Sequence, residues 1–160
     1  MSATTSQASA LPARPLRILY AEDVRELREL ARMILTHLGQ TIECFDNGRL
    51  AWDRVRQAPD DFDLIITDHH MPVMNGLEFV MLLRTLPFRG KIMVFSSDLD
   101  SGTAVLYKQQ NVDRILNKPV MPQVLRQVLA ELYASDVPEK ICSRAVRTAY
   151  EVAIDLLTAP

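Results

Sequence analysis

The sequence predicts an α/β protein in which a doubly wound sheet of five parallel strands is flanked by five helices. Short apolar runs, each long enough for one strand, alternate with segments whose apolar residues recur at helical spacing. Strands that alternate with helices favour a parallel sheet covered on both faces. One more segment with helical spacing follows this array, so we expect an extra C-terminal helix.

In the first half of the chain, Glu22-Asp23 ends the first apolar run, Gly39 suits a helix C-terminus, and Asn47-Gly48 favours a turn. These signals predict, in order, the strand Leu16–Ala21, the helix Val24–Leu38, the strand Thr41–Phe45 and the helix Arg49–Gln57. In the second half, Pro87 is expected to stop a helix. The elements predicted there are the strand Asp63–Thr67, the helix Gly76–Leu86, the strand Lys91–Phe95, the helix Ser101–Gln110, the strand Asp113–Asn117 and the helix Pro122–Tyr133.

Both ends of the chain differ from this array. Residues 1–15 are rich in Ser, Thr and Ala and are expected to form a disordered tail. Residues 16–135 form the predicted domain, and residues 136–160 a linker and a helical extension. The extension helix, Glu139–Thr158, is too short to be an independent domain. It must dock on the domain, pair with a partner or fray.

Composition excludes several classes of protein. A formal net charge of −2 over 160 residues argues against a nucleic-acid-binding surface. No apolar run approaches the length of a membrane span, and the first residues lack the pattern of a signal peptide. Cys44 and Cys142 lie far apart in the sequence, so a disulfide framework or a zinc site is not expected. A reducing, cytoplasmic setting is predicted.

Polar residues stand at the ends of four predicted strands, and in a parallel sheet these ends lie on one edge. They are Glu22, Asp23, Asp68, Ser96 and Lys118. Each close pair of carboxylates costs about 4 kcal/mol at an effective dielectric near 20, and one lysine cannot offset three. A divalent cation can offset this repulsion, and a site lined by carboxylates suits Mg²⁺. An ionised Asp68 beside a metal, a hydroxyl and an ammonium has the parts for phosphoryl transfer to a carboxylate.

Five motifs in register carry a resemblance to a known family. They are Glu22-Asp23, Phe45-Asp46-Asn47-Gly48 followed by Ala51, Asp68 followed by Met71-Pro72 and Gly76, Ser96, and Lys118-Pro119. From about Leu16 to Tyr133 the chain resembles a receiver domain of the response-regulator family of two-component and phosphorelay signalling. The similarity is to the single-domain, chemotaxis-regulator-like type, and it implies the flavodoxin-like receiver fold.

The resemblance implies a role for each matching residue. Asp68 would accept a phosphoryl group from the phosphohistidine of a histidine kinase or a phosphotransfer protein. Lys118 would pair with that group, and Ser96 would hydrogen-bond it after transfer. Mg²⁺, or Mn²⁺, would be bound by Glu22 (directly or through water), Asp23, Asp68 and the backbone carbonyl of His70.

The resemblance also implies a switch with self-catalysed transfer and autodephosphorylation rather than a turnover enzyme. Output is expected through protein contact or phosphoryl relay, without nucleic acid or membrane. The contact would use the face of the fourth and fifth helices, for a downstream target or a second copy, or the segment Glu139–Thr158. A small hydrolase with an aspartyl-phosphate intermediate and a degenerate scaffold remain alternatives. The hydrolase would carry a second Asp where this chain has His70.

Several positions depart from the family pattern. Glu22 replaces the usual first Asp, and Ser96 replaces Thr. Ile115 stands where many members carry an aromatic switch residue, which leaves the route of the signal open. His69 and His70 are expected to point apart and not to bind metal. His70 and Asp98, each two residues past a site residue, are expected to tune the lifetime of the phosphoryl group.

Overall fold

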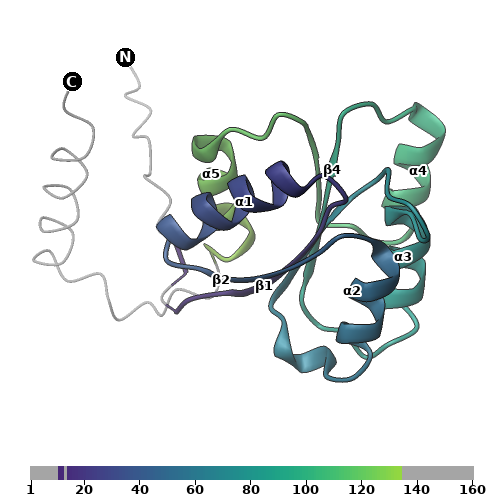
Figure 1. The fold of residues 1–160 in the computed structure, drawn as a ribbon, viewed down its shortest axis with the longest axis horizontal. Helices are drawn as coiled ribbons and strands as arrows, with labels where there is room; N and C mark the ends of the chain where they lie inside the picture. Colours follow the sequence, from purple (N-terminus) through teal and green to yellow (C-terminus); the bar gives the residue numbers. More distant parts are fainter. Residues whose placement is uncertain (1–10, 13, 135–160) are drawn as a thin grey trace, which may run out of the picture.

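A computed structural model of the protein describes residues 11–12 and 14–134 (Figure 1). The strands of this part are β1 (Arg17–Ala21), β2 (Thr41–Phe45), β3 (Leu64–Asp68), β4 (Lys91–Ser96) and β5 (Arg114–Asn117). Its α-helices are α1 (Arg25–His37), α2 (Gly48–Val55), α3 (Gly76–Leu83), α4 (Ser101–Gln109) and α5 (Pro122–Leu132). A short 3₁₀ helix, Pro59–Asp61, precedes β3.

The strands form one five-stranded parallel sheet in the order β2-β1-β3-β4-β5. Strand β3 lies at its centre, and all five of its residues are buried because both faces of the sheet are covered. The predicted doubly wound α/β fold with five strands and five helices is therefore confirmed. Within the described residues, no helix is long and apolar enough to cross a membrane. The cytoplasmic location stays a prediction.

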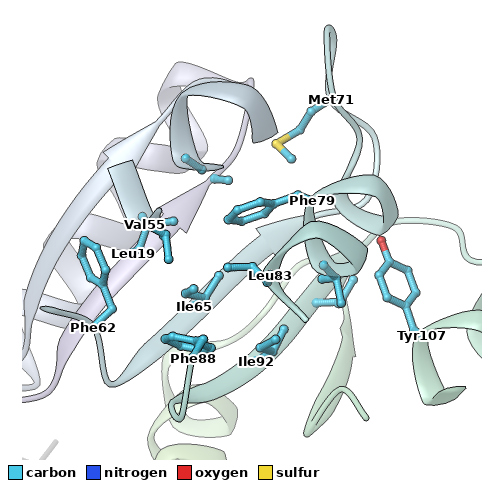
Figure 2. Packing of buried hydrophobic residues seen from close by; sticks show 14 residues of the cluster. Leu19, Val55, Phe62, Ile65, Met71, Phe79, Leu83, Phe88, Ile92 and Tyr107 are labelled. Carbon is cyan, nitrogen blue, oxygen red and sulfur yellow. The ribbon is translucent and has the colours of Figure 1, made fainter. Parts of the chain in front are cut away.

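The helices cover the sheet in two layers. Helices α1 and α5 lie on one face, and α2, α3 and α4 on the other (Figure 1). The core beneath α1 and α5 is built around Tyr20, Leu35 and Leu129. The core on the opposite face is built around Phe79 and Tyr107, as Figure 2 shows.

Some predicted boundaries were wrong. Asp68 belongs to β3, where it pairs with Phe95, although the strand was predicted to end one residue earlier. Asp63 and Asp113 were predicted to start strands but lie outside them. Their carboxylates accept hydrogen bonds from backbone N–H groups of the strands β1 and β4. At these strand ends, carboxylate oxygens thus accept backbone N–H groups in place of carbonyl oxygens of a neighbouring strand.

Two helices also differ from their predicted spans. Helix α2 begins at Gly48, because the Asn47 side chain caps the backbone N–H of Leu50. Helix α3 ends at Leu83, well before Pro87, because the N–H groups of Thr85 and Leu86 bond three residues back and tighten the chain into a turn. The smaller differences at other helix and strand ends are of one or two residues.

Some predictions lie outside the described residues. These are the extension helix Glu139–Thr158, the linker before it, Cys142 and most of the tail 1–15. The division of the chain into residues 1–15, 16–135 and 136–160 therefore stays a prediction.

Candidate functional site at the carboxyl edge of the sheet

Strand register brings the predicted site residues to one edge of the sheet. Ala21 of β1 pairs with Thr67 of β3, so the next residues, Glu22 and Asp68, are neighbours. Ser96 of β4 pairs with Asn117 of β5, and Lys118 follows directly. This edge is where open α/β sheets bind their ligands.

Three carboxylates meet at this edge. One oxygen from each of Glu22, Asp23 and Asp68 lies within 4.8 Å of the other two. Glu22 is fully buried and Asp68 nearly so, whereas Asp23 is exposed. Buried charges of one sign need compensation. Mg²⁺ prefers oxygen ligands and keeps several waters, and this cluster offers three carboxylates, of which Asp23 is open to solvent. The residues present therefore fit the metal that the sequence predicts.

Lys118 links two of these carboxylates. Its Nζ lies 2.5 Å from Glu22 Oε2 and 2.8 Å from Asp68 Oδ1. Burial opposes the charged form of the lysine, but the hydrogen bonds from its ammonium to Asp68 and Glu22 outweigh burial and raise the pKa of Lys118. The ammonium is therefore held between Glu22 and Asp68.

Ser96 lies at the end of β4 and is fully buried. Its Oγ is one of the few buried side-chain atoms of the described residues that have no hydrogen-bond partner. A buried hydroxyl without a partner costs stability. Its neighbour Ser97, in contrast, is exposed.

Two supporting residues were missed by the sequence reasoning. The hydroxyl of Tyr20 donates to Glu22 Oε2 at 2.8 Å. Burial first, and then the charge and hydrogen bond of Glu22, raise the pKa of Tyr20 above its ordinary value. The guanidinium of Arg28 donates to the backbone carbonyls of Glu22 and Asp23 at 2.6 and 2.8 Å. The i, i+2 spacing of Tyr20 and Glu22 was the only signal of the first contact.

The histidine pair differs from the expectation in one respect. The rings of His69 and His70 were expected to point apart, but their centroids are 4.4 Å apart in an edge-on arrangement. His69 Nδ1 lies 2.8 Å from the hydroxyl of Tyr107, a third residue that the sequence reasoning missed. Burial, and then His70, lower the pKa of His69. Among the described residues, the candidate metal cluster contains neither histidine.

The remaining predicted residues lie around this site or behind it. His70 and Asp98 are both exposed. Ile115 is half-buried and packs against the core beneath α3 and α4. The structure thus brings Glu22, Asp23, Asp68, Ser96 and Lys118 to one edge, whereas the tuning role of His70 and Asp98 stays a prediction.

Comparison with known proteins agrees with this geometry. The family model described as "Response regulator receiver domain" matches residues 18–130. Two-component response regulator ORR41 of Oryza sativa subsp. japonica is 30% identical over 118 residues, which cover 72% of this chain and 93% of that protein. The sensory/regulatory protein RpfC of Xanthomonas campestris pv. campestris (strain 8004) is 28% identical over 148 residues, 89% of this chain. The match spans only 20% of RpfC.

Solved structures show the same likeness. The chemotaxis protein CheY4 of Vibrio cholerae superposes with a TM-score of 0.68 at 27% identity, covering 73% of this chain and 98% of that one. The family model spans more than half of the 160 residues. The chain therefore belongs to the response regulator receiver domain family of two-component signalling.

Proposed function

We propose that Asp68 is the phosphoacceptor of this receiver domain and that the donor is a phosphohistidine of a histidine kinase or phosphotransfer protein. In this step the P–N bond of the donor breaks, and its electron pair returns to the histidine nitrogen. A carboxylate oxygen of Asp68 forms the new P–O bond. The observation that carries the proposal is the position of Asp68 on the central strand, 2.8 Å from Lys118 Nζ and within one acidic cluster.

The other residues of the site have separate roles in this proposal. Lys118 pairs with the incoming phosphoryl oxygens, and the buried, unpartnered Oγ of Ser96 supplies a hydrogen bond once the group is attached. Glu22, Asp23, Asp68 and the backbone carbonyl of His70 would hold Mg²⁺, for which Mn²⁺ could substitute. When bound, the metal would offset the negative charge of the carboxylates and the phosphoryl oxygens. The same site would later position the water that removes the phosphoryl group.

Labelling with a small phosphodonor tests the proposal. The protein is incubated with radiolabelled acetyl phosphate and Mg²⁺, and wild type is compared with Asp68→Ala. Asp60→Asn is the matched control, because Asp60 is an exposed carboxylate before β3, at the other edge of the sheet. One label per chain in wild type and control, lost in Asp68→Ala or with chelator, is the expected result.

Other results would contradict the proposal. Labelling that persists in Asp68→Ala would place the acceptor elsewhere. Multiple turnover on phosphomonoesters would indicate a small hydrolase, and no labelling of any variant would indicate a scaffold.

We infer that output passes through protein contacts of α4 and α5. Both helices carry exposed apolar side chains, namely Val105 and Leu106 on α4 and Val124 on α5. Exposed apolar side chains on these helices favour a protein partner, and we take a second copy of the chain as the candidate to test. We expect beryllofluoride and Mg²⁺ to increase the apparent mass in light scattering, and Leu106→Glu to abolish the increase. If the mass stays that of a monomer, the partner of α4 and α5 is a different protein and not a second copy.

We also propose that His70 and Asp98 tune the lifetime of the phosphoryl group. Both are exposed and lie two residues past Asp68 and Ser96, respectively. Replacing both by Ala should change the rate of label loss several-fold without changing the labelled fraction. An unchanged rate would rule out this role.

A further inference from the structure

Tyr20 occupies an unusual position for a tyrosine. It is the next-to-last residue of β1, is 2% exposed, and the centroid of its ring lies 5.8 Å from that of Phe95. Its neighbours in the core beneath α1 and α5 are otherwise mainly aliphatic. A buried phenolic hydroxyl needs an acceptor, because leaving it without one costs about 1–3 kcal/mol.

The acceptor of this hydroxyl is Glu22. Tyr20 lies in β1 and Glu22 directly follows the strand, two residues on; the hydroxyl of Tyr20 donates to Glu22 Oε2 at 2.8 Å. No other hydrogen bond of the Tyr20 hydroxyl is found among the described residues. A buried ring that extends from β1 and packs against Phe95 of β4 therefore directs its only polar atom to a carboxylate of the candidate metal cluster.

Glu22 needs this support more than a shorter acid would. Glu22 is 0% exposed, and its side chain has one more rotatable bond than Asp. Its Oε1 accepts only a long hydrogen bond, 3.3 Å, from the backbone N–H of Val24. Oε2 accepts from both Tyr20 and Lys118, but Lys118 is shared with Asp68. Of the two side chains that bond Oε2, Lys118 is shared with Asp68, whereas the Tyr20 hydroxyl has Glu22 as its one acceptor among the described residues and belongs to a buried ring.

We propose that Tyr20 is a positioning residue that holds the Glu22 carboxylate in the orientation needed for Mg²⁺. This inference rests on the proposed function of the acidic cluster. Residues that hydrogen-bond a metal ligand fix its orientation, and removing them typically weakens metal affinity by about 10–100-fold. Tyr20 acts on the metal only through Glu22, so its effect must disappear when Glu22 is changed.

The test is a metal titration of the unphosphorylated protein. Mg²⁺ affinity is measured by calorimetry, and Mn²⁺ affinity by electron paramagnetic resonance, for wild type and Tyr20→Phe. Tyr20→Phe keeps the ring and removes only the hydroxyl. We expect its dissociation constant to rise at least about ten-fold.

Tyr133→Phe is the matched control. Tyr133 belongs to the same core, is 6% exposed, and its hydroxyl donates to the backbone carbonyl of Asp63 at the opposite edge of the sheet. This variant should lose stability but bind Mg²⁺ as wild type does. A loss of affinity in both variants would mean that Tyr20 matters only through general stability, which would overturn the inference.

A double-mutant cycle separates positioning from packing. In a Glu22→Asp background the carboxylate is shorter by one methylene and should fall short of the Tyr20 hydroxyl. Adding Tyr20→Phe to Glu22→Asp should then change Mg²⁺ affinity less than two-fold. An equal loss in both backgrounds contradicts the inference.

Two results distinguish the inference from the proposed function. Wild-type Mg²⁺ binding with unchanged or tighter binding by Tyr20→Phe would overturn the role of Tyr20 and leave the function standing. A wild-type protein that binds neither Mg²⁺ nor Mn²⁺ would overturn both.

Discussion

The hydroxyl of Tyr107 lies 2.8 Å from Nδ1 of His69, so helix α4 is tied to the residue that directly follows Asp68. Tyr107 is 0% exposed and meets the histidine ring edge-on at 5.6 Å. Figure 2 shows its hydroxyl pointing away from the core, toward α3 and the loop that precedes it. The contact also requires a glycine at position 76, because a Cβ there would lie only 2.8 Å from the Tyr107 hydroxyl. A side chain of α4 thus reaches the residue that follows Asp68, whereas the side chain of Ile115 has no polar atom.

Replacing Tyr107 by Phe should remove this hydrogen bond between α4 and His69. Loss of one hydrogen bond should lower the free energy of unfolding by about 1 kcal/mol. Beryllofluoride with Mg²⁺ should then change hydrogen exchange in α4 less than it does in wild type. Tyr133→Phe is the control, because it removes a buried hydroxyl away from α4. An α4 exchange response equal to that of wild type would show that the signal takes another route.

The sequence predicted the fold and the acidic edge well because both depend on periodic patterns. Each strand is an apolar run, and a parallel sheet brings all strand ends to one edge whatever the loops do. Glu22, Asp68 and Lys118 could therefore be placed together without knowing any side-chain conformation. The end of α3 was missed by three residues, because turn hydrogen bonds decide it, and the end of β3 by one, because Asp68 still pairs with Phe95 of β4.

The supporting hydrogen bonds could not be predicted in the same way. Tyr20 and Tyr107 both match the apolar pattern of a core, and the pattern does not show where a hydroxyl finds its acceptor. The contact of Tyr107 joins residues 38 positions apart and depends on how α4 packs beside α3. The rings of His69 and His70 come together because the alternation of a strand ends at Asp68.

Ser96→Ala should separate stability from phosphoryl binding. Because the buried Oγ of Ser96 has no partner in the unphosphorylated protein, removing it should raise the free energy of unfolding by about 1 kcal/mol. The same change should weaken beryllofluoride binding, because a donor to the phosphoryl group is lost. Denaturant unfolding and a beryllofluoride titration measure the two effects. The exposed neighbour provides the control Ser97→Ala, which should change neither. A destabilised Ser96→Ala protein would contradict the first part.

Asp63 should make stability depend on pH in the acid range. Burial alone would raise the pKa of Asp63, but hydrogen bonds from Arg14 and Arg17 outweigh it and hold the pKa well below its ordinary value. As the pH falls below about 4, Asp63 is protonated in the unfolded chain but stays ionised in the folded protein, so the free energy of unfolding decreases.

Asp63→Asn should remove this pH dependence. The substitution should cost about 2 kcal/mol at pH 7, where the charged hydrogen bonds are complete. The difference from wild type should shrink steadily below pH ~4. Chemical unfolding at a series of pH values checks both points, with exposed Asp60→Asn as the control. A difference that stays constant down to pH ~2 would mean that the carboxylate charge is not the cause.

Val73 should be replaceable with a gain in stability. It has a φ of 69°, in the left-handed region, and is 82% exposed in the loop between β3 and α3. A β-branched side chain in this region is strained by about 1–2 kcal/mol, and this exposed valine buries little apolar area that could offset the strain. Asn tolerates the left-handed region far better. Val73→Asn should therefore raise the free energy of unfolding by about 1 kcal/mol.

The matched control is Val105→Asn, at a half-exposed site within the regular helix α4. Val and Asn have similar helix propensities, and no left-handed strain exists there to be relieved, so no gain is expected. Denaturant unfolding measures the free energy of unfolding of both variants. Equal gains would mean that a polar residue on the surface is stabilising at either position, and that relief of strain is not the cause. A gain confined to position 73 would show that the loop beside Asp68 is held in a strained conformation by the contacts around it, as occurs at binding and switch sites.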